Sequence, residues 1–264
     1  MGCRSAVVPL SLISMTDSFL QPYKRVIKAV LPMAFSFGAF RTGAQTPGLG
    51  TWNIISTRYT FNKKWSGFFE AQLRSQQFYT DFNYREFNGG VGYNLPKNVS
   101  FILAVGKYDT YQPTGTFKTP IVTNEFRIWE QLILNNTINR LKIEHRYRLE
   151  QRFINGDTYR NRFRYRLNAI LPINNKIIQK KTFYLSLADE IALNNRDIFF
   201  EQNRIFAGAG YGITNQVTIQ AGWLNRFDNL GNGIEQKKNF LQLSLLLSFS
   251  EVKSGTERHP SSVD

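Results

Sequence analysis

Apolar and polar residues alternate along most of this chain, in stretches separated by short segments rich in Asn, Gly, Asp or Pro. Alternation at every second residue is typical of a β-strand with one apolar face, and turns at this spacing indicate an antiparallel meander. The pattern predicts eleven strands, at 51–61, 65–79, 84–94, 98–109, 122–135, 139–153, 159–171, 182–193, 202–212, 216–227 and 238–249.

The length of the predicted strands favours a membrane protein over a soluble β-sandwich. Strands of soluble sheets are commonly about 5–6 residues long, whereas a strand that crosses a membrane needs about 9–11. The fold class expected from the sequence is therefore all-β, a single antiparallel transmembrane β-barrel of 10–12 strands. Bacterial single-chain barrels have even strand numbers. Either one strand escapes the pattern, or 51–61 is not an ordinary member of the barrel.

The clearest predicted hairpin joins 141–152 to 160–171 through a turn at 155–157, which sets Arg148 near Arg164. One face of this hairpin is cationic. It carries Lys142, Glu144, Arg146, Arg148, Glu150, Arg152, Arg160, Arg162, Arg164 and Arg166. The other face is apolar and is expected to contact lipid. Together with residues of the last two strands, the predicted lipid contacts are Leu141, Ile143, Tyr147, Phe163, Tyr165, Leu167, Ile219, Leu243 and Leu245.

The orientation of the hairpin follows from the free energy of placing charge in lipid. An arginine that faces lipid near the middle of a membrane costs about 2–4 kcal/mol, so the cationic row must point into the lumen. Two interpretations then stay open. In one, the long side chains fill the lumen and pair with acidic residues such as Glu70, Glu125 and Glu190. In the other, the row lines a pore or a binding site for small anions.

The first part of the chain has the features of a secretory signal peptide at 15–44. Three Lys or Arg side chains precede an apolar stretch at 29–40, and small residues lead up to a predicted cleavage after Ala44. Met15 is the expected start, and 1–14 is then an upstream extension. The sequence therefore predicts export through the general secretory pathway.

The region after the leader divides into a predicted barrel at 45–249 and a polar tail at 250–264. The last strand alternates apolar residues and closes with Phe249. This ending is typical of the signal that the barrel-assembly machinery recognises, although that aromatic usually ends the chain.

Composition removes several other classes of protein. No run of 18 apolar residues occurs, which excludes a helical membrane protein. The formal charge of +14 raises the question of nucleic-acid binding. Such binding needs basic and stacking aromatic residues on one exposed surface, but here they alternate to opposite faces. With one cysteine, Cys3, and two distant histidines, no metal site and no cofactor are expected.

Three glycines, Gly208, Gly210 and Gly212, recur at every second residue of one predicted strand. They are not followed by a helix that could complete a phosphate-binding loop. We expect them instead to relieve crowding or to permit bending in the barrel wall.

Several short motifs resemble one protein family when they are taken in order. They are Trp52 at the start of the first strand, Glu125–Trp129, Glu144–Arg148, Tyr159–Arg166 and Gly208–Tyr211. Together they resemble the domain-of-unknown-function family 2490, whose members are expected to be outer-membrane barrels of Gram-negative bacteria. The resemblance covers about 51–249. It implies an architecture and a location, and it carries no established activity.

Two alternative functions remain beside a non-enzymatic barrel with an Arg-rich lumen. A lipid-active enzyme could use the lipid-facing His145, beside which a turn at 135–138 would place Glu130. A nucleophile is missing there, because the neighbouring lipid-facing positions hold no serine. An adhesin or docking barrel would use its outer loops, first of all 110–121. The expected partners are outer-membrane lipid, the assembly machinery and small anions, with no nucleic acid.

Overall fold

The computed structural model describes residues 44–251 except 114, 157 and 197, and it describes side chains from Gly48 onward. The predicted upstream extension, almost all of the predicted signal peptide and most of the polar tail lie outside these residues. The part of the chain that is described contains no helix long and apolar enough to cross a membrane.

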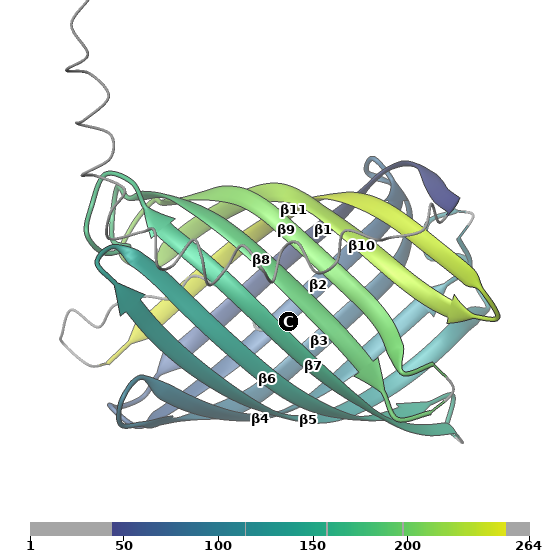
Figure 1. The fold of residues 1–264 in the computed structure, drawn as a ribbon, viewed down its shortest axis with the longest axis horizontal. Helices are drawn as coiled ribbons and strands as arrows, with labels where there is room; N and C mark the ends of the chain where they lie inside the picture. The colour runs from purple at the N-terminus through teal and green to yellow at the C-terminus, as the bar shows by residue number, and fades with distance from the viewer. Residues whose placement is uncertain (1–43, 114, 157, 197, 252–264) are drawn as a thin grey trace, which may run out of the picture. The chain divides into compact units, whose positions relative to one another are not determined.

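Eleven strands form one closed β-barrel, in which each strand pairs with its neighbours in the chain (Figure 1). The all-β fold and the number of strands agree with the prediction of 10–12. The strands are β1 Ala44–Thr60, β2 Trp65–Gln77, β3 Thr80–Leu95, β4 Val99–Tyr111, β5 Ile121–Ile138, β6 Leu141–Ile154, β7 Thr158–Pro172, β8 Phe183–Asn194, β9 Phe200–Gly212, β10 Val217–Gly231 and β11 Ile234–Ser250.

The odd strand number is accommodated where the barrel closes. All neighbouring pairs are antiparallel except β1 and β11, which run parallel, with Trp52 opposite Gln242 and Tyr59 opposite Phe249. In a closed meander with an odd number of strands, the first and last strands must point the same way. The stretch predicted at 51–61 is therefore a full member of the wall, and it is the strand whose pairing departs from the usual rule.

The connections alternate between two rims. We call the rim where β11 ends the C-terminal rim. It carries 61–64, 96–98, 139–140, 173–182 and 213–216. The opposite rim carries 78–79, 112–120, 155–157, 195–199 and 232–233. In the sequence, short connections rich in Asn and Lys alternate with mostly longer or more irregular ones, which predicts short turns on one rim and longer loops on the other. The observed lengths of the connections do not follow this prediction. At 80–83, 228–231 and 234–237 mostly polar residues continue the strands, and the C-terminal rim holds the long connection 173–182.

The interior of the barrel is packed with side chains. One apolar cluster lies inside β1 and β9–β11 and consists of Trp52, Ile54, Phe206, Leu224 and Phe240. A second lies inside β4 and β5 and consists of Ile102, Ala104, Trp129 and Ile133, with Phe68 packed against it. Charged side chains fill much of the remaining interior. The lumen is thus organised as a core.

The glycines of β9 make room for aromatic rings on the inside of the wall. A Cβ atom added at Gly208 would lie 2.6 Å from the ring of Phe206, and one at Gly210 would lie 2.1 Å from the ring of Tyr184. These separations are far below van der Waals contact. The expectation that glycine relieves crowding here is confirmed.

Candidate functional site

The β6–β7 hairpin has the register that the sequence predicts. Arg148 lies opposite Arg164, and Glu150 lies opposite Arg162. Nine of the ten residues predicted to line the lumen are buried, and Arg160 is half-buried. The residues between them are half-buried or exposed on the outside of the wall. The alternation has therefore placed the charged row inside the barrel and the apolar row outside it.

Glu150 is the centre of the charge network in the lumen. Its carboxylate is fully buried, and Arg162 and Arg164 approach it to 2.8 Å. Arg148 and Arg127 lie slightly farther away, at 3.5 and 3.6 Å. Four guanidinium groups from three strands thus surround one carboxylate, and Arg148, Arg162 and Arg164 donate charge-assisted hydrogen bonds to it.

Further carboxylates extend the network across neighbouring strands. Glu190 on β8 accepts hydrogen bonds from Arg164, at 2.5 and 3.1 Å, and from Arg146. Arg204 on β9 lies 3.5 Å from the same carboxylate. Because Arg164 contacts both Glu150 and Glu190, the network is continuous around this side of the lumen.

Towards the opposite rim the network ends in a smaller group. Glu125 holds Arg127 through two hydrogen bonds of 2.8 Å and also contacts Arg152. Glu201 joins Arg152 and Arg162, at 3.1 and 3.0 Å. Each of these arginines therefore bridges two acidic side chains, and this cross-linking fixes their positions.

Aromatic rings hold several of the same guanidinium groups from the other side. Arg148 lies 4.0 Å from the ring centre of Trp129, Arg127 lies 3.6 Å from that of Tyr108, and Arg74 lies 3.4 Å from that of Trp52. A guanidinium over an aromatic face is favourable when it is removed from water. The sequence predicted the arginine row of the hairpin but missed these rings, because strand alternation alone does not separate an inward Trp from an outward one.

The buried charges come close to balance. Among the buried residues that the structure describes, ten are Lys or Arg and eight are Asp or Glu. The fully buried groups therefore carry only a small excess of positive charge. Half-buried arginines that also point inward, among them Arg160 and Arg204, add to it. No group of three or more His, Cys, Asp or Glu that could hold a metal ion occurs among the described residues.

The predicted pairing of His145 with Glu130 is wrong. Glu130 lies opposite Leu149 and accepts a hydrogen bond of 3.1 Å from Gln151, while His145 lies opposite Leu134. The cause is the position of the turn. The strands β5 and β6 continue to a two-residue connection at 139–140, which moves the register by four residues from the one expected for a turn at 135–138.

The partner of His145 is a tyrosine on the next strand. The Nδ1 atom of His145 lies 2.9 Å from the hydroxyl oxygen of Tyr165, and the rings are nearly parallel. Tyr147 also packs against Tyr165, with ring centres 5.0 Å apart. The sequence predicted both tyrosines as lipid contacts and did not predict this contact with His145.

A row of polar groups crosses the outer face of β5–β8. We call it the outer polar stripe, and it consists of Glu130, His145, Tyr147, Tyr165 and Asp189. Each of these side chains is half-buried and lies well inside its strand, away from both rims. The stripe is unusual because the neighbouring outward positions are mostly apolar.

Asp189 is the member of the stripe that the sequence analysis missed. It follows Phe183, Leu185 and Leu187 on the outward face of β8, where the alternation predicts an apolar residue. Asn203 of β9 donates a hydrogen bond of 2.6 Å to its Oδ1 atom. An acidic residue in the apolar phase of an alternating strand is the signal that could have identified it.

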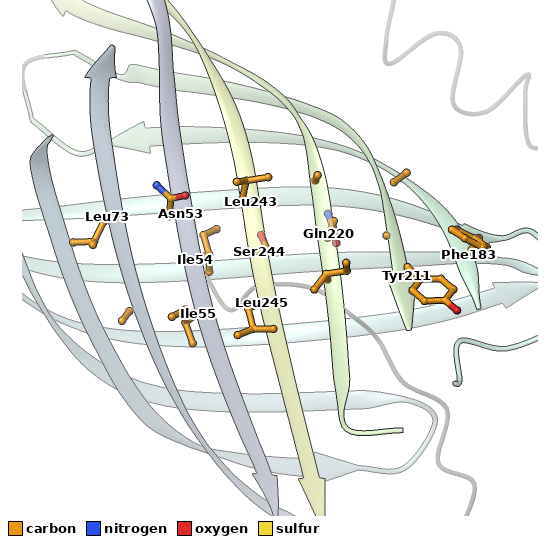
Figure 2. A pocket seen from close by; sticks show the side chains of 15 residues that line it. Asn53, Ile54, Ile55, Leu73, Phe183, Tyr211, Gln220, Leu243, Ser244 and Leu245 are labelled. Carbon is orange, nitrogen blue, oxygen red and sulfur yellow. The ribbon is translucent and has the colours of Figure 1, made fainter. Parts of the chain in front are cut away.

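The outer face on another side of the barrel is a shallow apolar groove of about 610 Å³ (Figure 2). It extends over strands β1, β2 and β8–β11. Its lining is Asn53, Ile54, Ile55, Ala71, Leu73, Phe183, Ala209, Gly210, Tyr211, Ile219, Gln220, Ala221, Leu243, Ser244 and Leu245. In Figure 2, Leu73 and Phe183 lie at opposite ends of the lining, and Leu243 and Leu245 lie between them. No charged residue lines this groove.

Comparison with known proteins identifies a family and nothing narrower. Neither the curated proteins nor the solved structures include a match to this chain. The model of a family described as protein of unknown function (DUF2490) matches residues 49–237, from within β1 to the beginning of β11. This match covers more than half of the chain and agrees with the resemblance carried by its motifs. The chain belongs to the DUF2490 family of proteins of unknown function.

Proposed function

We propose that this protein is a non-enzymatic outer-membrane β-barrel of a Gram-negative bacterium, and that its own charged side chains close its lumen at rest. The first support is the outward face. Most of the exposed aromatic residues lie near one of the two rims, as expected for side chains at the two membrane–water interfaces, whereas Phe87, Phe163 and Trp223 lie nearer the middle of their strands. Those near the C-terminal rim are Tyr59, Phe61, Trp65, Phe183 and Phe249, and those near the opposite rim are Phe78, Tyr79, Phe126, Phe153, Tyr159 and Phe199.

Exposed aliphatic residues occupy many of the outward positions between the two rims, among them Val91, Leu103, Leu187 and Ile219. Exposed apolar surface of this extent is costly in water, because each square ångström removed from water contributes roughly 25 cal/mol. A hydrocarbon environment removes that cost. Phe249, at the end of the last paired strand, is in the position expected for the assembly signal.

The observation that carries the closed lumen is the burial of the charge network. Glu150 is fully buried, and Arg148 and Arg164 are each 1% exposed. An open aqueous pore would leave its lining side chains accessible to water. Paired and cross-bridged guanidinium groups, supported by two apolar clusters, are instead typical of a lumen filled by side chains.

A second candidate is the passage or binding of small anions, and the mild excess of buried Lys and Arg favours it. Rings of Arg and Lys line anion pores. This candidate requires that Arg148 or Arg164 exchange a carboxylate partner for the anion. Lipid hydrolysis by His145 has weaker support, since Glu130 is not beside it and its hydrogen-bond partner is the phenol of Tyr165.

Planar-bilayer recording of the purified protein separates the two candidates. A closed lumen predicts no steady conductance from the wild type. It also predicts open channels when Arg148 and Arg164 are both replaced by Ala, since two long side chains are then removed from the network. Anion-selective steps from the wild type that shrink in Arg148→Glu or Arg164→Glu would establish the pore instead. Lys63→Glu, on the C-terminal rim, is the control for a general change in charge.

Cell fractionation tests the location independently of conductance. The protein is expected in the outer-membrane fraction, extractable by detergent and resistant to salt or carbonate washing. If it remained in aqueous solution as a compact monomer without detergent, the proposed outward contact with lipid would be wrong.

A further inference from the structure

The outer polar stripe lies where the proposed membrane location places hydrocarbon. Asp189 is the seventh of the 12 residues of β8, Tyr165 the eighth of the 15 residues of β7, and Tyr147 the seventh of the 14 residues of β6. All three project outward from the middle of their strands, between the aromatic residues of the two rims. Ionisable groups at membrane depth are rare and commonly mark a functional contact.

The stripe has hydrogen-bonding capacity that the described part of the barrel does not use. Asp189 accepts a hydrogen bond at Oδ1 from Asn203 and one from the backbone N–H of Glu190, although a carboxylate can accept about four. Within the described residues, the hydroxyl of Tyr147 makes no hydrogen bond, and the Nε2 atom of His145 makes none. Lipid chains offer neither donors nor acceptors, so a lipid neighbour leaves these groups unsatisfied.

The hydroxyl of Tyr147 and the carboxylate of Asp189 lie on opposite sides of β7. Tyr147 is directly across from Tyr165, and Asp189 is directly across from Leu167, the next outward residue of β7. A two-fold axis parallel to the barrel axis and passing in front of β7 exchanges the positions of β6 and β8. That operation brings Tyr147 of each copy to Asp189 of the other, as an isologous contact requires.

We propose that the outer polar stripe is a self-association surface, through which two copies of this chain form a dimer in the membrane plane. The inference rests on the proposed function, because it requires the stripe to face hydrocarbon. Tyr165 stacks near the axis, with its hydroxyl held by His145, and the two Tyr147 hydroxyls donate to the two Asp189 carboxylates. Polar groups that are unsatisfied in lipid are a recognised driving force for contacts between membrane segments.

The apolar groove explains why we place the contact with the second copy at the outer polar stripe and not elsewhere on the wall. Its outward side chains are apolar except for Asn53 and the hydroxyl of Tyr211, and Asn53 already accepts a hydrogen bond from Tyr79. Such a surface has far fewer polar groups to satisfy in lipid than the stripe has. The dimer contact is therefore confined to β6–β8, and the groove stays in contact with lipid.

Disulfide cross-linking tests the outer polar stripe as a dimer surface. The chain has a single cysteine, Cys3, so a Cys3→Ser background contains no other thiol. Leu167→Cys places a thiol beside the proposed axis, and Leu245→Cys places a matched thiol on the outward face of β11. Each variant is reconstituted in phosphatidylethanolamine–phosphatidylglycerol vesicles and oxidised with copper phenanthroline. We expect a cross-linked dimer from Leu167→Cys and monomer from Leu245→Cys.

Two results would overturn the dimer: no cross-link from Leu167→Cys, or equal cross-linking at both positions. Labelling with a bulky water-soluble maleimide tests the proposed membrane location separately. If both positions face lipid, the two cysteines stay protected in the vesicles. If both cysteines react readily, the proposed function is wrong. Protected cysteines that do not cross-link leave the membrane location standing and refute the dimer alone.

Sedimentation equilibrium in detergent tests the named side chains. Asp189→Leu and Tyr147→Phe each remove both of the symmetric hydrogen bonds, so we expect the dimer dissociation constant to rise by on the order of tenfold. Asn53→Leu, a similar mid-strand change on β1, should leave association unchanged. An unchanged dissociation constant in Asp189→Leu, with the barrel still folded, contradicts the proposed contact.

Discussion

Two sectors of the same barrel wall use strand alternation in opposite ways. Inside β5–β8 the wall carries a network of charged side chains, whereas inside β1 and β9–β11 it carries the apolar cluster around Trp52 and Phe240. Outside, the first sector carries the outer polar stripe and the second carries the apolar groove. The first sector thus carries its charged network inside and polar groups outside. The second carries an apolar cluster inside, beside polar side chains such as Gln220 and Lys238, and an apolar surface outside.

The comparison indicates that the sectors are stabilised by different interactions. The apolar sector depends on packing, in which each lost contact has a graded effect. The charged sector depends on pairing, in which a single missing partner leaves a buried charge uncompensated. Removal of one charge from the network inside β5–β8 should therefore lower the free energy of unfolding more than a similar change outside the network does.

Glu150→Gln should have the largest effect of the changes considered. It keeps the shape of the side chain but removes the negative charge among four guanidinium groups. Breaking a buried ion pair in this way costs about 3–5 kcal/mol. Urea unfolding of the refolded barrel in vesicles, followed by tryptophan fluorescence, measures the loss.

The matched control for Glu150→Gln is Glu130→Gln on the outside of the same sector. Glu130 has one hydrogen-bonding partner, Gln151, and no ion pair among the described residues. Its replacement should change the free energy of unfolding by less than about 1 kcal/mol. Equal losses for the two variants would show that the network inside β5–β8 contributes no special stability.

An arginine introduced on the outer face should lower the free energy of unfolding by an intermediate amount that differs between the two sectors. Leu243→Arg places a charge in the apolar groove and should lower the free energy of unfolding by about 2–4 kcal/mol. Leu187→Arg places the same charge two residues from Asp189 on the same face of β8. Pairing with that carboxylate should reduce the loss clearly below that of Leu243→Arg in the same unfolding assay. Equal losses would show that Asp189 does not act as an acceptor on this face.

Much of the fold could be predicted from the sequence, because alternation over long stretches reports both strand identity and the face that each residue occupies. The β6–β7 register followed from one short turn and needed no further information. Strand ends were harder to predict. At 80–83, 228–231 and 234–237 the strands extend through mostly polar residues. Hydrogen bonding across the sheet continues there although the apolar signal has stopped.

The candidate site was predictable in part for the same reason. The arginine row lies in a strictly alternating segment, so its inward orientation could be predicted from the sequence. The error at Glu130 and His145 came from a turn placed four residues early, since cross-strand neighbours depend on the turn position. Asp189 was missed because one acidic residue in an apolar phase changes the average pattern of β8 very little.

The smallest expected effect concerns the contact between His145 and Tyr165. Tyr165→Phe removes the phenol oxygen that lies 2.9 Å from Nδ1 of His145. One such hydrogen bond contributes about 0.5–1.5 kcal/mol to the free energy of unfolding. His145→Ala should give a loss that includes the same contact, so the double variant should lose less than the sum of the two single variants.

Tyr159→Phe is the comparison for this hydrogen bond. The hydroxyl of Tyr159 donates to Asn161 near the opposite rim, where the tyrosine is exposed and water can replace the lost partner. Its loss should therefore be smaller than that of Tyr165→Phe, because a hydroxyl partner removed from water has no substitute. Additive losses for His145 and Tyr165 would remove the evidence that these two side chains act together. Lipid hydrolysis that disappears in His145→Ala would instead assign this pair a catalytic role and reverse the non-enzymatic proposal.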